Sequence, residues 1–308
     1  MPSISRVIKG VAAVLALSSQ VSAIDWSLPS DLLKNPLYGA VDNNFNCRSE
    51  KHPNPLIMLH GLSANREVDL NTLGWNLTDA GYCVFSMTYG AHTLVPWIGG
   101  LKSMRESAKE VAAFIKEVKT KTGAQKVDLL GHSEGVTELI VINQGVMAIY
   151  VPMTQSGIAE IVDHNIALGP AIHGAKYFGF TDLLYFGGEV TRNLASLALK
   201  VLGCAACDDM ATDGDVYDDF KANAGKIIQP GNKASIIMSN TDTLVAPATS
   251  RIDEPGARNI IVQDTCPDDA VGHAGLAWDK TVWGLVVNEL TEDYNRKFEC
   301  AKGLVFRK

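Results

Sequence analysis

Short apolar runs alternate with amphipathic stretches along most of the chain. The six runs that predict buried strands are residues 56–60, 83–87, 127–130, 161–168, 235–239 and 259–263. The stretches that predict helices are 67–80, 102–119 and 277–296. In 102–119 the apolar residues recur at helical steps of three and four, namely Met104, Ala108, Val111, Ile115 and Val118. Strands that alternate with helices predict an α/β fold, with a mostly parallel central sheet and helices on both faces.

The alternation stops between Pro170 and Pro230. A helical apolar stripe lies here, consisting of Leu183, Phe186, Val190, Leu194, Leu197 and Val201. It fits a helix packed on the core and equally a cap or lid over a site, because a closed lid also turns its apolar face inward. We assign residues 171–230 to such an insertion. The aspartates at 208, 209, 213, 215, 218 and 219 do not have calcium-loop spacing, and we expect them to form a solvated acidic surface.

The first 23 residues resemble a secretory signal peptide. Arg6 and Lys9 are followed by the apolar run 11–17 and by the small-residue site Val21-Ser22-Ala23. The apolar run is far below the roughly 20 residues that a membrane span needs. A membrane anchor is the alternative. We predict cleavage after Ala23, a mature α/β domain over residues 24–308, and a secreted, extracellular protein.

Charge argues against nucleic acid as a partner. The full chain has 27 basic and 34 acidic residues, and loss of Arg6 and Lys9 leaves 25 against 34, a net charge of −9. An acidic surface without a basic stripe repels phosphate backbones.

The even set of six cysteines predicts three disulfides in an oxidising compartment. Sequence does not determine their connectivity. The pairs that we expect are Cys47–Cys83, Cys204–Cys207 and Cys266–Cys300. A redox role for the Cys204-Ala-Ala-Cys207 motif is the alternative for the second pair. Asn76-Leu77-Thr78 is an N-glycosylation sequon, and whether it is used stays open.

The most informative motif is Gly131-His132-Ser133-Glu134-Gly135, which follows the strand at 127–130. The residues after it predict a helix. A G-x-S-x-G sequence between a strand and a helix is typical of a nucleophile elbow, a tight turn that presents the serine hydroxyl at the carboxyl end of the strand. Ser133 is therefore the candidate nucleophile.

A serine hydroxyl needs an adjacent base, which a carboxylate must orient. The chain order serine, acid, histidine selects His273, in the glycine-flanked loop after the last strand. Asp242, just after the strand at 235–239, is the candidate acid, and Asp264 is the runner-up. The elbow would turn His132 away from the serine, so we expect it to support the strand. His164 and His173 fit structural or pocket-lining positions.

The oxyanion formed by attack needs two backbone donors. We assign them to the N–H groups of Glu134, directly after the serine, and of Leu62, in the loop after the first strand. Gly61 lets the backbone approach closely, and His60 is expected to brace this loop by hydrogen bonding. The predicted reaction is acyl transfer from an ester to water through an acyl-enzyme.

Four segments of the chain together resemble the class 2 lipases, which are secreted α/β-hydrolases related to triacylglycerol lipases. They are residues 55–62, residues 81–90, the elbow with Ile166-Ala167-Leu168-Gly169-Pro170 and His173-Gly174, and Cys266-Pro267 with Gly272-His273-Ala274-Gly275-Leu276. The resemblance implies the α/β-hydrolase fold with a helical cap or lid insertion. It also implies the triad of Ser133, Asp242 and His273, and oxyanion donors at Leu62 and Glu134. The family often has glutamine after the serine, where this chain has Glu134.

For substrate and partners, the resemblance implies an ester or triglyceride, possible work at a lipid–water interface, and no cofactor or metal. A cutinase-like polyester hydrolase, an acyltransferase or a peptidase would share the same triad. A non-catalytic α/β-hydrolase that only binds ligands is a further alternative. Acyl-chain preference, interfacial activation and oligomeric state stay open.

Overall fold

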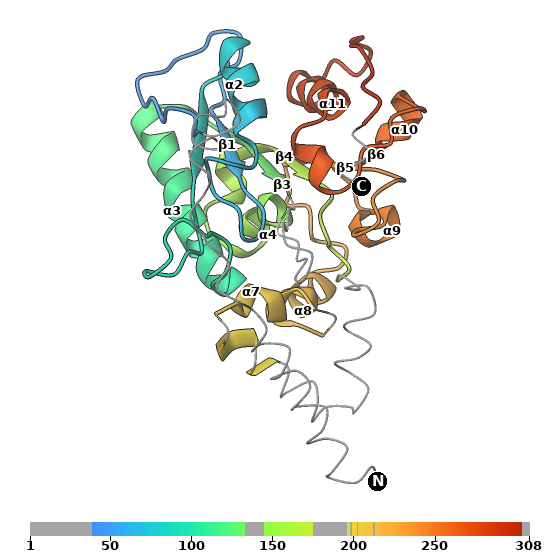
Figure 1. The fold of residues 1–308 in the computed structure, drawn as a ribbon. Helices are drawn as coiled ribbons and strands as arrows, with labels where there is room; N and C mark the ends of the chain where they lie inside the picture. Colours follow the sequence, from blue (N-terminus) through green and yellow to red (C-terminus); the bar gives the residue numbers. More distant parts are fainter. Residues whose placement is uncertain are drawn as a thin grey trace, which may run out of the picture. The chain divides into compact units, whose positions relative to one another are not determined.

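In the computed structural model, the described residues are 39–132, 145–174, 196–211 except 198 and 202, and 213–303. Within them, six parallel strands form one sheet in the order β2-β1-β3-β4-β5-β6 (Figure 1). The strands are β1 (Leu56–Leu59), β2 (Val84–Met87), β3 (Val127–His132), β4 (Val162–Leu168), β5 (Lys233–Met238) and β6 (Ala257–Ile261). Every strand predicted from the sequence is present, with ends shifted by one or two residues.

Helices cover both faces of this sheet (Figure 1). The longer ones are α2 (Asn71–Asp79), α3 (Met104–Thr122), α4 (Met147–Thr154), α8 (Asp215–Ala222) and α11 (Lys280–Thr291). The shorter ones are η1 (Ala159–Ile161), α7 (Ala205–Asp209), α9 (Pro247–Ser250), α10 (Val262–Thr265) and η2 (Ala274–Ala277).

The alternation of side chains along β1 divides the interior into two cores. Ile57 and Leu59 pack with α3 and α4 on one face, while Leu56 and Met58 pack with α2 and α11 on the other. Because successive residues of a strand point to opposite faces, an unbroken apolar run is what a sheet covered on both sides requires. The predicted mostly parallel α/β fold is confirmed.

The sheet has a topological switch point between β1 and β3. From β1 the chain passes to β2 on one side and then returns, through α3, to β3 on the other side. In parallel sheets, ligands bind beyond the carboxyl ends of the strands at such a point. The loop after β1 and the residues after β3 begin there, so the topology predicts a ligand site at this edge.

The last predicted helix is shorter than the apolar pattern suggested. It begins at Lys280 because the Asp279 carboxylate caps it, accepting the Thr281 N–H at 2.7 Å. It ends at Thr291, since Glu292 adopts a left-handed backbone with φ 54°. The final residues predicted for β6 instead form the helical turn α10.

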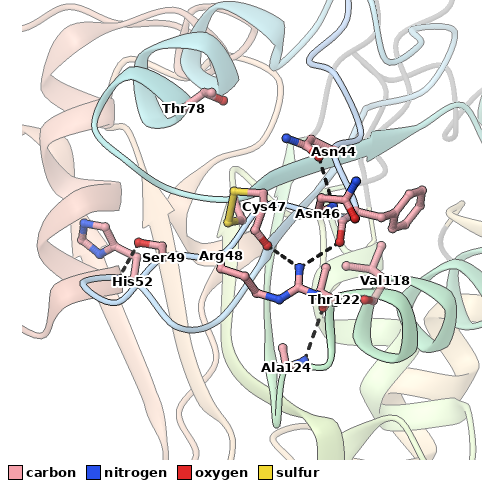
Figure 2. The surroundings of a disulfide bond; sticks show 12 residues. Asn44, Asn46, Cys47, Arg48, Ser49, His52, Thr78, Val118, Thr122 and Ala124 are labelled. Carbon is pink, nitrogen blue, oxygen red and sulfur yellow. Dashed lines mark hydrogen bonds between the residues drawn. A yellow bond between two sulfur atoms is a disulfide. The ribbon is translucent and has the colours of Figure 1, made fainter.

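All three expected disulfides are present: Cys47–Cys83, Cys204–Cys207 and Cys266–Cys300. Figure 2 shows the surroundings of the first, which ties the segment before β1 to the residue before β2. Arg48 Nη1 reinforces this corner by donating to the carbonyl oxygens of Phe45 at 2.8 Å and Cys47 at 2.6 Å (Figure 2).

The prediction that the aspartates between 208 and 219 form a solvated acidic surface is wrong for several of them. Asp208 and Asp209 are buried, and Asp209 accepts the Met104 N–H at 2.7 Å. Asp219 pairs with Arg105 at 2.8 Å. The Met104 N–H at the start of α3 is the donor to Asp209, and the Arg105 guanidinium is the partner of Asp219.

Parts of the sequence predictions fall outside the described residues. These are the signal segment 1–23, the helix after the elbow, and the apolar stripe as far as residue 195. Among the helices that the structure does describe, none is long and apolar enough to cross a membrane.

Candidate active site

Three predicted site residues lie in loops that leave the carboxyl edge of the sheet: Leu62 after β1, Asp242 after β5 and His273 after β6. Two more, Ser133 and Glu134, follow the end of β3 in sequence and lie outside the described residues.

The imidazole of His273 is paired with the carboxylate of Asp242. Nδ1 of His273 lies 2.5 Å from Oδ2 of Asp242, and each side chain is only 1% exposed. The other carboxylate oxygen accepts the N–H groups of Leu244 and Val245, each at 2.8 Å. Because a carboxylate only accepts, Nδ1 carries the hydrogen, and Nε2 is the nitrogen that can take a proton.

Hydrogen bonds join the loop that carries the acid to the loop that carries the base. Ser239 and Thr241 both donate from their hydroxyls to the Val271 carbonyl oxygen, at 2.6 and 2.7 Å. Gln263 donates to the Asp269 carbonyl oxygen at 2.6 Å and accepts the Asn240 N–H at 2.8 Å. These bonds fix the separation of the two loops. No sequence motif pointed to Gln263.

The end of β4 lies against the imidazole. A Cβ atom on Gly169 would lie 3.1 Å from Cε1 of His273 and 2.9 Å from Cδ1 of Leu276, and φ at Gly169 is +54°. Glycine is therefore required twice, for its backbone and for its missing side chain. Gly131, at the end of β3, is equally crowded, because a Cβ there would lie 2.9 Å from the Gly145 carbonyl oxygen.

The loop after β1 includes a backbone donor at Leu62, between two neighbours whose N–H groups are hydrogen-bonded. Gly61 N–H donates to Asp69 Oδ2 at 2.8 Å, and Ser63 N–H donates to the Gly99 carbonyl oxygen at 3.0 Å. Between them, the N–H of Leu62 has no hydrogen-bond acceptor in the part of the chain that the structure describes. A donor held between two fixed neighbours is suited to stabilise a developing oxyanion.

His60 has the bracing geometry expected of it. Its Nδ1 donates to the Gly61 carbonyl oxygen at 2.6 Å, and its Nε2 accepts the Tyr89 N–H at 3.2 Å. Its ring stacks on Tyr89 with centroids 4.3 Å apart. Burial lowers the pKa of His60 and raises that of Tyr89, which favours the neutral form of both side chains.

The side chains of the remaining candidates have other partners or are exposed. Asp264 is exposed on α10 and does not contact the imidazole, for which Asp242 is the partner. His173 is exposed and its Nε2 bonds to the Arg251 carbonyl oxygen at 2.8 Å. His132, at the end of β3, is buried and bonded to Asp69 at 2.7 Å.

His164 lies near the amino ends of β3 and β4, at the edge opposite the candidate site. Its Nδ1 lies 3.0 Å from Asp128 Oδ1 and 3.6 Å from Asp163 Oδ2. These three side chains offer ligand atoms within 4.8 Å of one another. Asn54 already donates to both carboxylates, and Lys233 lies 3.5 Å from Asp163, so the cluster is satisfied by donors of the chain itself.

Part of the chain is similar to a known protein family, and its fold is similar to solved structures. Residues 53–174 match the family model "Lipase (class 2)". Among curated proteins, none matches the chain. The solved structures that match include a monoacylglycerol lipase from Paleococcus ferrophilus, with 16% identity, a TM-score of 0.51, and coverage of 80% of this chain and 96% of that one.

A second solved structure comes from a report on LipS and LipT, two metagenome-derived lipolytic enzymes. It shares 10% identity, with a TM-score of 0.50 and coverage of 80% of this chain and 98% of that one. At such identities the likeness establishes the fold. Together with the match of residues 53–174 to the class 2 lipase model, it supports a serine ester hydrolase with the α/β-hydrolase fold.

Proposed function

We propose that the chain is a secreted triacylglycerol lipase in which Ser133 is the nucleophile, His273 the general base and Asp242 the orienting acid. The observation that supports this most strongly is the bond of 2.5 Å between His273 Nδ1 and Asp242 Oδ2. It fixes the tautomer in which Nε2 faces the reaction as a base.

In the proposed mechanism, the Ser133 oxygen attacks the ester carbonyl carbon while His273 Nε2 takes the hydroxyl proton. Asp242 stabilises the imidazolium that forms. The N–H groups of Leu62 and Glu134 hold the negative oxygen of the tetrahedral intermediate, and each such donor is typically worth about 100- to 1000-fold in rate. His273 then protonates the leaving alcohol. Water, activated by the same imidazole, releases the acid and regenerates Ser133.

Exposed apolar side chains beside the donor loop support a lipid substrate. Leu94 is 89% exposed and Trp97 is 62% exposed. Their segment is bonded to the loop after β1, since Asn65 donates to the Trp97 carbonyl oxygen at 2.9 Å. Large exposed apolar residues next to a site are typical of surfaces that meet an apolar partner.

The signal-like segment and the three disulfides support export, because disulfides persist in oxidising compartments. N-terminal sequencing of the protein recovered from a secreting host tests this part. We expect a mature chain that begins at Ile24.

The activity is tested by measuring the hydrolysis of p-nitrophenyl esters of increasing chain length and then of triolein emulsions. We expect hydrolysis of both, and a loss on the order of a million-fold in kcat for Ser133→Ala. Hydrolysis of short esters without triolein would favour the cutinase-like alternative. Ester formation exceeding hydrolysis when an alcohol is added would favour an acyltransferase. An unchanged rate in Ser133→Ala would contradict the assignment of Ser133 as the nucleophile.

A further inference from the structure

One buried carboxylate, Asp69, connects three of the four chain segments that the proposed chemistry uses. Its Oδ2 accepts the Gly61 N–H at 2.8 Å, in the donor loop after β1. Its Oδ1 lies 2.7 Å from Nδ1 of His132, at the end of β3. Nε2 of His132 lies 3.3 Å from the carbonyl oxygen of His273, in the base loop. Asp69, His132 and His273 are each 0% exposed.

Burying the Asp69 carboxylate costs solvation free energy, and packing alone does not explain why it is buried. A buried carboxylate is tolerated only when hydrogen bonds satisfy it, and an apolar residue of similar volume is often equally stable. Both ring nitrogens of His132 face oxygen acceptors, so the ring is held from both sides. Asp69 and His132 therefore define a fixed geometry between chain segments that are far apart in sequence.

The segments so fixed are those that carry the two proposed oxyanion donors. The Gly61 N–H is anchored by Asp69 and the Ser63 N–H by Gly99, and planar peptide units between two anchors leave the Leu62 N–H little freedom. On the other side, His132 directly precedes Ser133 and lies two residues before Glu134.

We propose that Asp69 and His132 are a positioning pair, which holds the Leu62 donor loop and the nucleophile elbow in register. Neither residue contacts the reacting atoms, and the inference rests on the proposed function. Misplacing a donor weakens an interaction made mainly in the transition state. Loss of the pair therefore lowers kcat and leaves KM for a soluble ester nearly unchanged.

The test compares Asp69→Ala with Asp128→Ala. Asp128 is a matched control, because it is also buried, bonds to a histidine Nδ1 at 3.0 Å and accepts a backbone N–H at 3.0 Å, all at the opposite edge of the sheet. Rates are measured with p-nitrophenyl butyrate and expressed per active site titrated with a phosphonate, so that unfolded protein does not contribute.

We expect both variants to melt at lower temperature, and only Asp69→Ala to lose kcat, by about 10- to 100-fold, part of the value of one oxyanion donor. Asp69→Asn keeps an oxygen for the Gly61 N–H and an amide for His132, and it should stay within about threefold of wild type if hydrogen-bond geometry is what matters. His132→Asn, which cannot span from Asp69 to the His273 carbonyl oxygen, should lose kcat as Asp69→Ala does.

A kcat for Asp69→Ala within twofold of wild type, at a lowered melting temperature, would overturn the positioning role and leave a purely structural one. Equal losses of kcat in Asp69→Ala and Asp128→Ala would overturn it as well. An inactive wild-type enzyme would instead contradict the proposed function. If Asp69→Ala cannot be purified folded, the comparison of His132→Asn with Asp128→Ala decides the question.

Discussion

Nδ1 of His273 and Oδ2 of Asp242 are 2.5 Å apart in a site where both side chains are 1% exposed. The two residues are separated by 31 positions in the sequence, and they meet because β5 and β6 are parallel neighbours whose carboxyl ends lie at one edge. Their bond selects one tautomer of the imidazole, and the proposed chemistry depends on that tautomer.

Replacing Asp242 with asparagine should therefore disable the base without disturbing its surroundings. The amide presents a donor or a neutral acceptor to Nδ1, and the imidazole no longer has a fixed tautomer or a counter-charge. We expect kcat to fall by about 10⁴-fold with KM little changed, as measured with p-nitrophenyl butyrate. Asp264→Asn is the control, because Asp264 is exposed and does not contact His273. A similar loss in both variants would contradict this role of Asp242.

Substituting Gly169 with alanine should impair catalysis through steric contact with the base. The new Cβ would lie 3.1 Å from Cε1 of His273, at a residue with φ +54°. Gly157 offers a matched control, since its φ is +74° and a Cβ there would meet nothing within 4 Å.

Both alanine variants should lose about 1–2 kcal/mol of unfolding free energy from the left-handed backbone. Only Gly169→Ala should also lose kcat. Chemical denaturation and steady-state rates of the two proteins provide the comparison. Full activity in Gly169→Ala would show that the imidazole can shift without consequence.

Asp279, whose carboxylate caps α11, should make the stability of the protein depend on pH. Burial, reinforced by the neighbouring charge of Asp269, raises the pKa of Asp279 to about 6. In the unfolded chain an aspartate titrates near 3.9, so between these values the folded protein binds more protons and its stability falls as pH rises.

Asp279→Asn removes this titration and keeps the helix cap. The unfolding free energy of the variant relative to wild type should increase from pH 4 to pH 7, by at most about 3 kcal/mol. Urea unfolding at pH 4, 5, 6 and 7 measures the difference. A difference that does not vary with pH would show that Asp279 is not protonated in this range.

The exposed side chains of Leu94 and Trp97, beside the donor loop, should affect the rate of hydrolysis only on aggregated substrate. We expect the double variant Leu94→Ser and Trp97→Ser to hydrolyse triolein emulsions about tenfold or more slowly, because burial of one large apolar side chain is worth roughly 1.5–3 kcal/mol. Its rate on soluble p-nitrophenyl butyrate should stay within twofold of wild type.

Tyr294→Ser is the control for lost surface hydrophobicity, because Tyr294 is 45% exposed and stacks on Arg258, with the guanidinium carbon 3.8 Å from the ring centroid. Equal losses on emulsion and on soluble ester in the double variant would instead indicate damage to the donor loop.

The strands could be predicted from sequence because a sheet covered on both faces needs unbroken apolar runs, and Leu56–Leu59 is buried at every position. The His273–Asp242 pairing followed from the order of residues and from their places after strands. The last helix was predicted to begin at residue 277 but begins at Lys280, because Asp279 caps it and the apolar pattern does not show where a cap lies.

The supporting residues of the site were beyond prediction for a different reason. Asp69 falls in the predicted helix 67–80 and Gln263 at the end of the predicted strand 259–263, and an exposed side chain is the ordinary expectation for a polar residue. Their roles arise only when segments from different strands meet at the sheet edge, as the bond of Asp69 to His132 at the end of β3 shows. The buried Asp209 was misjudged likewise, since its partner is a backbone N–H some hundred residues away, at Met104.

Covalent trapping shows whether Ser133 is acylated in a reaction that needs His273 as the base. Purified protein is treated with a p-nitrophenyl alkylphosphonate, digested and analysed by mass spectrometry, with His273→Ala treated in parallel. We expect one phosphonate adduct, on the peptide that contains Ser133, and at least a thousand-fold slower labelling of His273→Ala, in line with the cost of losing a triad member. An active enzyme that carries the adduct on another residue, or that labels equally fast without His273, would contradict it.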